Sequence, residues 1–167
     1  YDEGSYAPHL DRVLREQREK GVSHIINCGS DVASSRRSVE LAARYDLICA
    51  AVGVFPLSVG ELAEGWLEEI RTLSMREKAV AIGEIGLDYH AGTTDRDRQM
   101  AVFAAQLKLA KKQGLPIQIH DRDADADALA LVEQEDGLIS RLLEVAGVRP
   151  EDISRELKQE LEGHPKV

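Results

Sequence analysis

The chain has 167 residues and a formal net charge of −9, with 43% hydrophobic and 31% charged residues. This composition predicts a folded globular domain rather than a disordered chain. The acidic balance excludes a broad basic surface for duplex DNA, although a bound metal ion can still create a small phosphate site. No apolar run is long enough to cross a membrane, and Cys28 and Cys49 form no CxxC pattern. We therefore expect a cytoplasmic protein with buried free thiols.

Short apolar segments alternate with amphipathic segments along most of the chain. The predicted elements are a helix over Leu10–Gln17, a strand over Ser23–Cys28, a helix over Ser34–Tyr45, a strand over Leu47–Val54, a helical stripe over Leu62–Leu73, a strand over Ala79–Leu87, a helix over Gln99–Lys112 and a strand over Leu115–His120. Apolar strands that alternate with helices are typical of parallel α/β structure. After residue 134 the pattern is helical only. We predict one domain, 1–167, with its strands in 1–133 and a helical tail over 134–167.

The strand-end residues Glu84 and His120 are the candidates for chemistry. Burying an unpaired carboxylate is costly, so Glu84 needs a metal ion, a cationic side chain or a proton as its partner. His120 ends the next predicted strand, and adjacent parallel strands lie about 5 Å apart. One carboxylate and one imidazole are therefore expected to reach the same metal ion. The residues alone leave two alternatives open, a buried salt bridge for Glu84 and a structural hydrogen bond for His120.

Three segments of the sequence resemble signatures of one protein family. These are Gly83–Tyr89 (GEIGLDY), Ile119–Ala124 (IHDRDA) and Ala50–Pro56 (AAVGVFP). They resemble the TatD-like deoxyribonucleases, which are metal-dependent hydrolases of the amidohydrolase type. The resemblance covers roughly residues 1–133 and implies an α/β fold of the (β/α)8 TIM-barrel type. The chain offers about four parallel strands, so we expect a partial barrel followed by the helical tail.

The resemblance also implies a function and a set of site residues. Glu84 and His120 would be metal ligands, and Glu84 and Arg122 would be the catalytic residues, with Arg122 near the substrate phosphate. The implied reaction is cleavage of phosphodiester bonds in DNA by water activated by a divalent ion, either Mg²⁺, Mn²⁺ or Zn²⁺. Asp88 is left open between a contact to the metal and the positioning of a loop.

The sequence departs from the family pattern at several points. It begins just past the position of the family's Asp-Thr-His-x-His, and Phe55 replaces the histidine of Gly-Val-His-Pro. The later strand-end histidine and the Glu-Thr-Asp strand do not follow His120. Two alternatives therefore stand beside the nuclease, namely a catalytically impaired family member and a metal-dependent hydrolase of another ester or amide. A partial barrel would also leave sheet edges unpaired, so we expect self-association.

Overall fold

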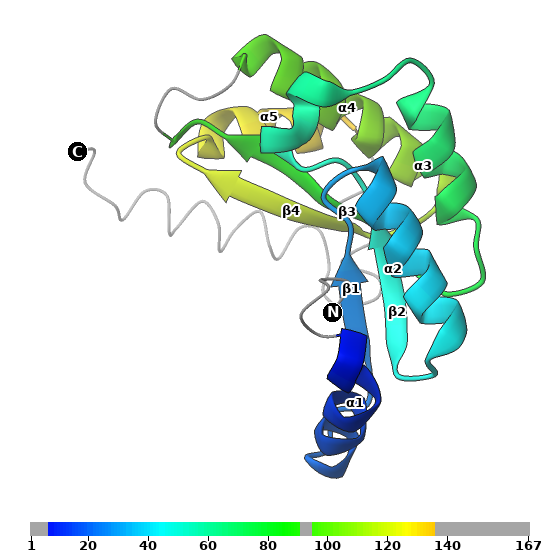
Figure 1. The fold of residues 1–167 in the computed structure, drawn as a ribbon. Coiled ribbons are helices and arrows are strands. Elements are labelled where there is room, and N and C mark those ends of the chain that lie inside the picture. Colours follow the sequence, from blue (N-terminus) through cyan, green and yellow to red (C-terminus); the bar gives the residue numbers. More distant parts are fainter. Residues whose placement is uncertain (1–6, 91–94, 136–167) are drawn as a thin grey trace, which may run out of the picture.

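The computed structural model describes residues 7–90 and 95–135, and four parallel strands form its sheet (Figure 1). The strands are β1 (Ile25–Cys28), β2 (Ile48–Val52), β3 (Ala79–Asp88) and β4 (Ile117–Arg122), and they lie side by side in chain order. The helices are α1 (Leu10–Glu19), α2 (Val32–Arg44), α3 (Trp66–Ser74), α4 (Arg96–Gln113) and α5 (Asp125–Gln134), with short 3₁₀ helices η1 (Ala7–His9) and η2 (Pro56–Glu61). This arrangement is a partial (β/α) barrel, as the sequence predicts.

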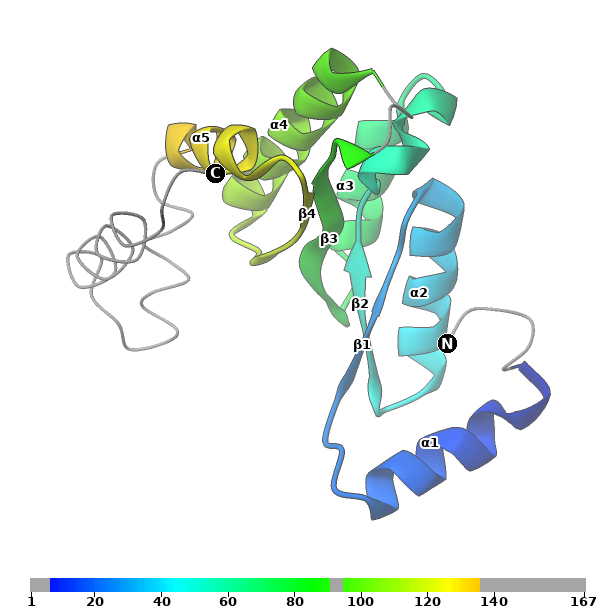
Figure 2. The same cartoon turned by 90° about the vertical axis from the view of Figure 1, so that its left-hand side faces the viewer.

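Helices α2, α3 and α4 cover one face of the sheet, as Figures 1 and 2 show. On β1, Asn27 points into this layer and donates a hydrogen bond from Nδ2 to Ser38 Oγ at 2.8 Å. The neighbouring residue Ile26 points the other way and is 53% exposed. On the outer strand β4, Ile119 is 40% exposed. The described part of the chain thus has one covered sheet face and apolar groups at both outer strands.

The core lies between the sheet and this helical layer. Its large, fully buried side chains are Ile48, Val52, Val54, Val59, Ile70, Ile82, Ile85, Leu87, Phe103 and Leu107. Most of them come from the apolar runs that predict the strands, and Phe103 and Leu107 come from the apolar stripe of α4. Burial of this apolar surface supplies the main driving force for folding. None of the helices within the described ranges is long and apolar enough to span a bilayer.

The connection from β1 to α2 is short and tightly fixed. Asp31 caps the helix, because its Oδ1 accepts a hydrogen bond from the Ser34 amide at 2.6 Å, and Ser34 Oγ accepts one from the Asp31 amide at 2.9 Å. Burial raises the pKa of Asp31, but the hydrogen bonds that its carboxylate accepts, together with the charge of Arg37, outweigh this effect and lower the pKa overall. This capping box starts α2 directly at the carboxyl edge of the sheet.

Several predicted boundaries differ from the observed ones. Helix α4 begins at Arg96 rather than Gln99, because Asp95 Oδ1 accepts a hydrogen bond from the Arg98 amide and so caps an earlier turn. The stripe predicted over Leu62–Leu73 is helical only from Trp66. Apart from residues 134 and 135, the predicted helical tail lies outside the described residues.

Candidate metal centre

The irregular pairing of β3 with β4 places the candidate side chains. The register between these strands shifts just before Ile85, and beyond the shift Gly86 pairs with His120. Glu84 lies within the shifted part of β3, where its amide donates a hydrogen bond to the carbonyl of Gly29 at 3.1 Å. That bond joins β3 to the loop after β1. Glu84 is therefore fixed near the carboxyl edge, beside the strand that carries His120.

Glu84 and His120 face one another. The distance from Glu84 Oε1 to His120 Nδ1 is 3.4 Å, and the side chains of Glu84 and His120 are 36% and 23% exposed. The structure thus brings together the two residues that the sequence nominates as metal ligands. The pair remains partly open to solvent, so an ion and a water molecule can approach it.

Asp88 supplies a second carboxylate to the same imidazole. Its Oδ2 lies 3.0 Å from His120 Nε2, and its side chain is only 4% exposed. Burial raises the pKa of Asp88, but the hydrogen bonds from His120 and from the His90 amide, with the electrostatic attraction of His120 and Arg122, outweigh it. The pKa of Asp88 is therefore lowered, and this carboxylate is held in its charged form.

Two buried glutamines on α4 fix the end of β3 and the segment that follows β2. Gln99 accepts a hydrogen bond from the Asp88 amide at 2.8 Å and donates one to the Asp88 carbonyl at 2.9 Å. Gln106 makes the same pair of bonds to the amide and carbonyl of Val54, at 2.7 and 3.1 Å. Sequence analysis missed both glutamines. The sequence does contain a pattern that could have identified them, because Gln99 and Gln106 are polar residues spaced seven apart on the apolar face of a helix.

The ring of Phe55 lies beside the imidazole of His120. The two ring centroids lie 4.6 Å apart in an edge-to-face arrangement. The Phe55 amide donates a hydrogen bond to the Ser30 carbonyl at 2.9 Å, which fixes the loop after β2 to the loop after β1. Phe55 therefore shields one side of the imidazole from water.

Arg122 and Cys28 lie at the margins of this centre. Arg122 ends β4, is exposed, and its charge acts on the buried Asp88. Cys28 ends β1, and its thiol donates a hydrogen bond to Gln118 Oε1 at 2.8 Å. Burial and the nearby charge of Glu84 raise the pKa of Cys28 despite that bond. Cys28 and Cys49 are free, as predicted, but both are only partly buried. Each lies in a strand of a sheet that the described helices cover on one face only.

The Glu84–His120 pair fits a shared metal ion. Two donor atoms that each lie about 2.1 Å from a tetrahedral ion are separated by about 3.4 Å, which matches the observed distance between Oε1 and Nδ1. A carboxylate and an imidazole are also suitable donors for Mn²⁺ or Zn²⁺. Among residues 7–90 and 95–135, no group of three or more histidine, cysteine, aspartate or glutamate side chains is arranged so that it could hold one metal ion. The described residues thus supply two donors of a site that needs more.

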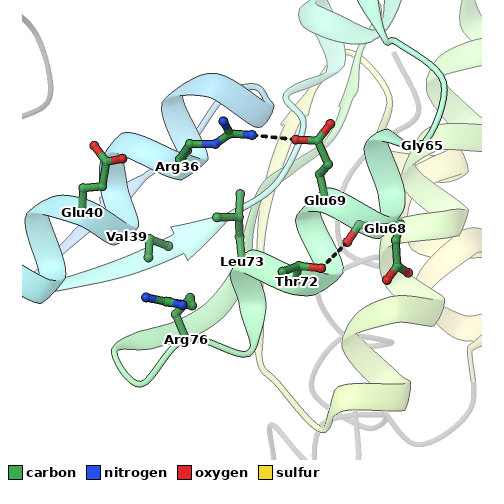
Figure 3. A pocket seen from close by; sticks show the side chains of 9 residues that line it. All are labelled: Arg36, Val39, Glu40, Gly65, Glu68, Glu69, Thr72, Leu73 and Arg76. Atoms are coloured by element: carbon green, nitrogen blue, oxygen red, sulfur yellow. Dashed lines mark hydrogen bonds and ion pairs between the residues drawn. The ribbon is translucent and has the colours of Figure 1, made fainter.

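A groove on the helical layer is separate from this centre. It has a volume of about 520 Å³ and lies between α2 and α3, where Figure 3 shows Arg36 reaching Glu69 across it. The Nη2 of Arg36 and the Oε2 of Glu69 are 2.7 Å apart. The groove's lining includes none of the site residues predicted from the sequence.

The described residues thus form a parallel partial barrel that brings a carboxylate and an imidazole together toward the carboxyl ends of its strands. The model of the TatD related DNase family matches residues 1–143, so the chain belongs to this family. It is similar to the uncharacterized metal-dependent hydrolase YabD of Bacillus subtilis, with 39% identity over 130 residues. It is also similar to the 3′-5′ ssDNA/RNA exonucleases TatD of Erwinia tasmaniensis (31% over 129 residues) and Yersinia pseudotuberculosis (35% over 120 residues).

The chain spans about half the length of the relatives that it matches. The matched part is 78% of this chain and 51% of YabD, 77% and 50% for the Erwinia protein, and 71% and 46% for the Yersinia protein. The crystal structure of YjjV, a TatD homologue from Escherichia coli K12, superimposes with a TM-score of 0.76 and 28% identity. That superposition covers 81% of this chain and 53% of YjjV. The fold is therefore that of part of a TatD-type barrel.

Proposed function

We propose that this chain contributes the metal centre of a hydrolase that cleaves phosphodiester bonds in DNA with metal-activated water. The observation that carries the proposal is the 3.4 Å approach of Glu84 Oε1 to His120 Nδ1 within two family signature segments. The names of the relatives, a metal-dependent hydrolase and 3′-5′ ssDNA/RNA exonucleases, support the reaction class and a nucleic-acid substrate.

Each residue of the centre has a separate task in this proposal. Glu84 and His120 hold a divalent ion, Mg²⁺, Mn²⁺ or Zn²⁺. When bound, such an ion lowers the pKa of a water molecule and offsets charge on the phosphoryl oxygens. Arg122 binds the substrate phosphate through its exposed guanidinium group. Phe55 excludes water from one side of the imidazole.

Cleavage of an end-labelled single-stranded DNA tests this function. We expect cleavage with Mg²⁺ or Mn²⁺ that is lost with EDTA and lost in Glu84→Gln. Glu69→Gln is the matched control, because this glutamate pairs with Arg36 on the helical layer, away from the centre. It should cleave like the wild type.

Other outcomes of the same assay contradict the proposal in different ways. Cleavage that persists with EDTA would exclude a metal-dependent reaction. Metal-dependent turnover of an ester or amide without DNA cleavage would identify a hydrolase of another substrate. A folded wild-type chain without turnover on any of these substrates would be a catalytically impaired family member. No contact among the described residues favours either alternative.

We further propose that the chain associates with itself through its outer strands. Within the described ranges, β1 and β4 each pair with a strand on one side only, and Ile26 and Ile119 are exposed on them. An unpaired edge with apolar side chains is a template for pairing with another chain. Sedimentation equilibrium should show a dimer that Ile26→Lys shifts toward monomer. A wild-type chain that stays monomeric up to about 100 μM would contradict this proposal. The free energy of association would then be weaker than about 5.5 kcal/mol.

The cytoplasm is the compartment that we propose for this protein. Both cysteines, Cys28 and Cys49, are free thiols. Glutathione and thioredoxin keep thiols reduced in that compartment, whereas oxidising compartments favour disulfides. Free, partly accessible thiols therefore suit a cytoplasmic protein.

A further inference from the structure

We infer that Asp88 is a positioning residue, which fixes the imidazole of His120 so that Nδ1 faces Glu84 and the metal ion. The inference rests on the proposed metal centre and assigns the role that the sequence leaves open for Asp88. The two ring nitrogens of His120 face different carboxylates. Nε2 lies 3.0 Å from Asp88 Oδ2, whereas Nδ1 lies 3.4 Å from Glu84 Oε1.

The two distances indicate different interactions. A separation of 3.0 Å is usual for a hydrogen bond from N–H to oxygen, and a carboxylate can only accept, so Nε2 carries the proton. In the neutral ring Nδ1 then has a free lone pair. The approach of Nδ1 to the Glu84 oxygen at 3.4 Å requires a positive charge, which either a second proton on the ring or a metal ion between the two atoms supplies. The geometry therefore directs Nδ1 of His120, and not Nε2, toward the ion.

Asp88 is itself held rigidly enough to orient another side chain. Its backbone amide and carbonyl are both bonded to Gln99, which is fully buried. Its Oδ1 accepts a hydrogen bond from the His90 amide at 3.0 Å. This second bond fixes the plane of the carboxylate. A residue that only shaped the loop after β3 would need only the hydrogen bond to Oδ1. In Asp88 the second oxygen, Oδ2, also contacts His120.

The remaining side of the imidazole is also constrained. The Phe55 ring meets that of His120 edge to face, at 4.6 Å between centroids. The His120 ring therefore lies between Asp88, Glu84 and Phe55, which leaves it little freedom to turn. Carboxylates that receive the second N–H of a metal-bound histidine set the tautomer and the orientation of the ring, and losing one typically costs 10–100-fold in metal affinity.

Two measurements test the role of Asp88. Long-range ¹H–¹⁵N NMR correlation of the metal-free protein, at a pH where the His120 ring is neutral, should show a proton on Nε2 and none on Nδ1. Asp88→Ala should give a mixture of tautomers, whereas Asp88→Asn should keep the proton on Nε2, because the amide oxygen still accepts. In calorimetric titration with Zn²⁺, Asp88→Ala should bind about 10–100-fold more weakly, with most of the loss restored in Asp88→Asn.

Asp123→Asn is the matched control. This aspartate is an exposed partner of His90, at 2.8 Å, whereas the charged partners of His120 among the described residues are Glu84 and Asp88. It should change neither the tautomer nor the affinity. A proton on Nδ1 in the wild type, or unchanged Zn²⁺ affinity in Asp88→Ala, would overturn the inference. The NMR measurement needs no bound ion. If the wild type bound no metal, the proposed function would be refuted, but the NMR result would still test the role of Asp88.

Discussion

Glu84→Gln is expected to weaken the binding of Zn²⁺ or Mn²⁺ by more than about 100-fold, a larger loss than the removal of an outer hydrogen-bond partner causes. Glutamine keeps the size and shape of glutamate, so the packing of β3 against the Gly29 carbonyl should survive. What it removes is the negative charge that faces Nδ1 of His120 at 3.4 Å. Calorimetric titration of the wild type and the variant measures the difference.

Two comparisons make this result specific to the metal centre. Glu69→Gln makes the same chemical change on α3, where the side chain pairs with Arg36, and should bind the ion like the wild type. Asp88→Ala should fall between the two, because it acts through His120 and not on the ion. If Glu84→Gln bound the ion within about threefold of the wild-type affinity, the difference in binding free energy would be less than about 1 kcal/mol. That result would exclude Glu84 as a ligand.

Gly86→Ala is expected to destabilise the fold by about 3 kcal/mol or more. Gly86 has φ of +139°, a conformation that residues with a side chain rarely adopt. A Cβ atom there would also collide with the carbonyl of His120, lying 2.9 Å from its carbon, and would stand 3.0 Å from the His120 amide nitrogen. The only relief is a displacement of β4 from β3, which would move His120 away from Glu84.

Two other glycines separate the causes of this loss in urea unfolding. Gly21 also has a positive φ, +89°, but a Cβ there would meet nothing within 4 Å. Gly60 has neither a positive φ nor a close neighbour. We expect Gly60→Ala to be nearly neutral, Gly21→Ala to lose about 1 kcal/mol, and Gly86→Ala to lose the most. Equal stability of the Gly21 and Gly86 variants would show that the β3–β4 approach is not tight.

The strands, the helices and their alternation could be predicted because they depend on local patterns. Each strand is an apolar run, and the segments between the strands have helical periodicity, so the parallel α/β class follows without knowledge of tertiary contacts. The start of α4 was predicted three residues too late. Its cap, Asp95, lies among charged residues that look alike in sequence, and only the hydrogen bond to the Arg98 amide distinguishes it.

The arrangement of the centre could be predicted only in part. Glu84 and His120 lie toward the carboxyl ends of the neighbouring strands β3 and β4, so their approach follows from the topology. The contact of Asp88 with His120 depends on the register beyond the shift in β3, which pairs Gly86 with His120. A regular hydrophobic pattern sets the register of regular strands, but it does not locate an irregular shift such as the one between Ile82 and Ile85. The bonds from Gln99 to Asp88 depend in turn on where α4 crosses β3.

The most direct test of this account is the position of the ion itself. Crystals soaked in Zn²⁺ and measured at the zinc absorption edge would locate the metal by its anomalous signal. We predict one peak about 2.1 Å from both Glu84 Oε1 and His120 Nδ1, with Asp88 still bonded to Nε2. A peak at Nε2, or no peak between Glu84 and His120 in crystals that contain zinc elsewhere, would contradict the assignment of this pair as the metal centre.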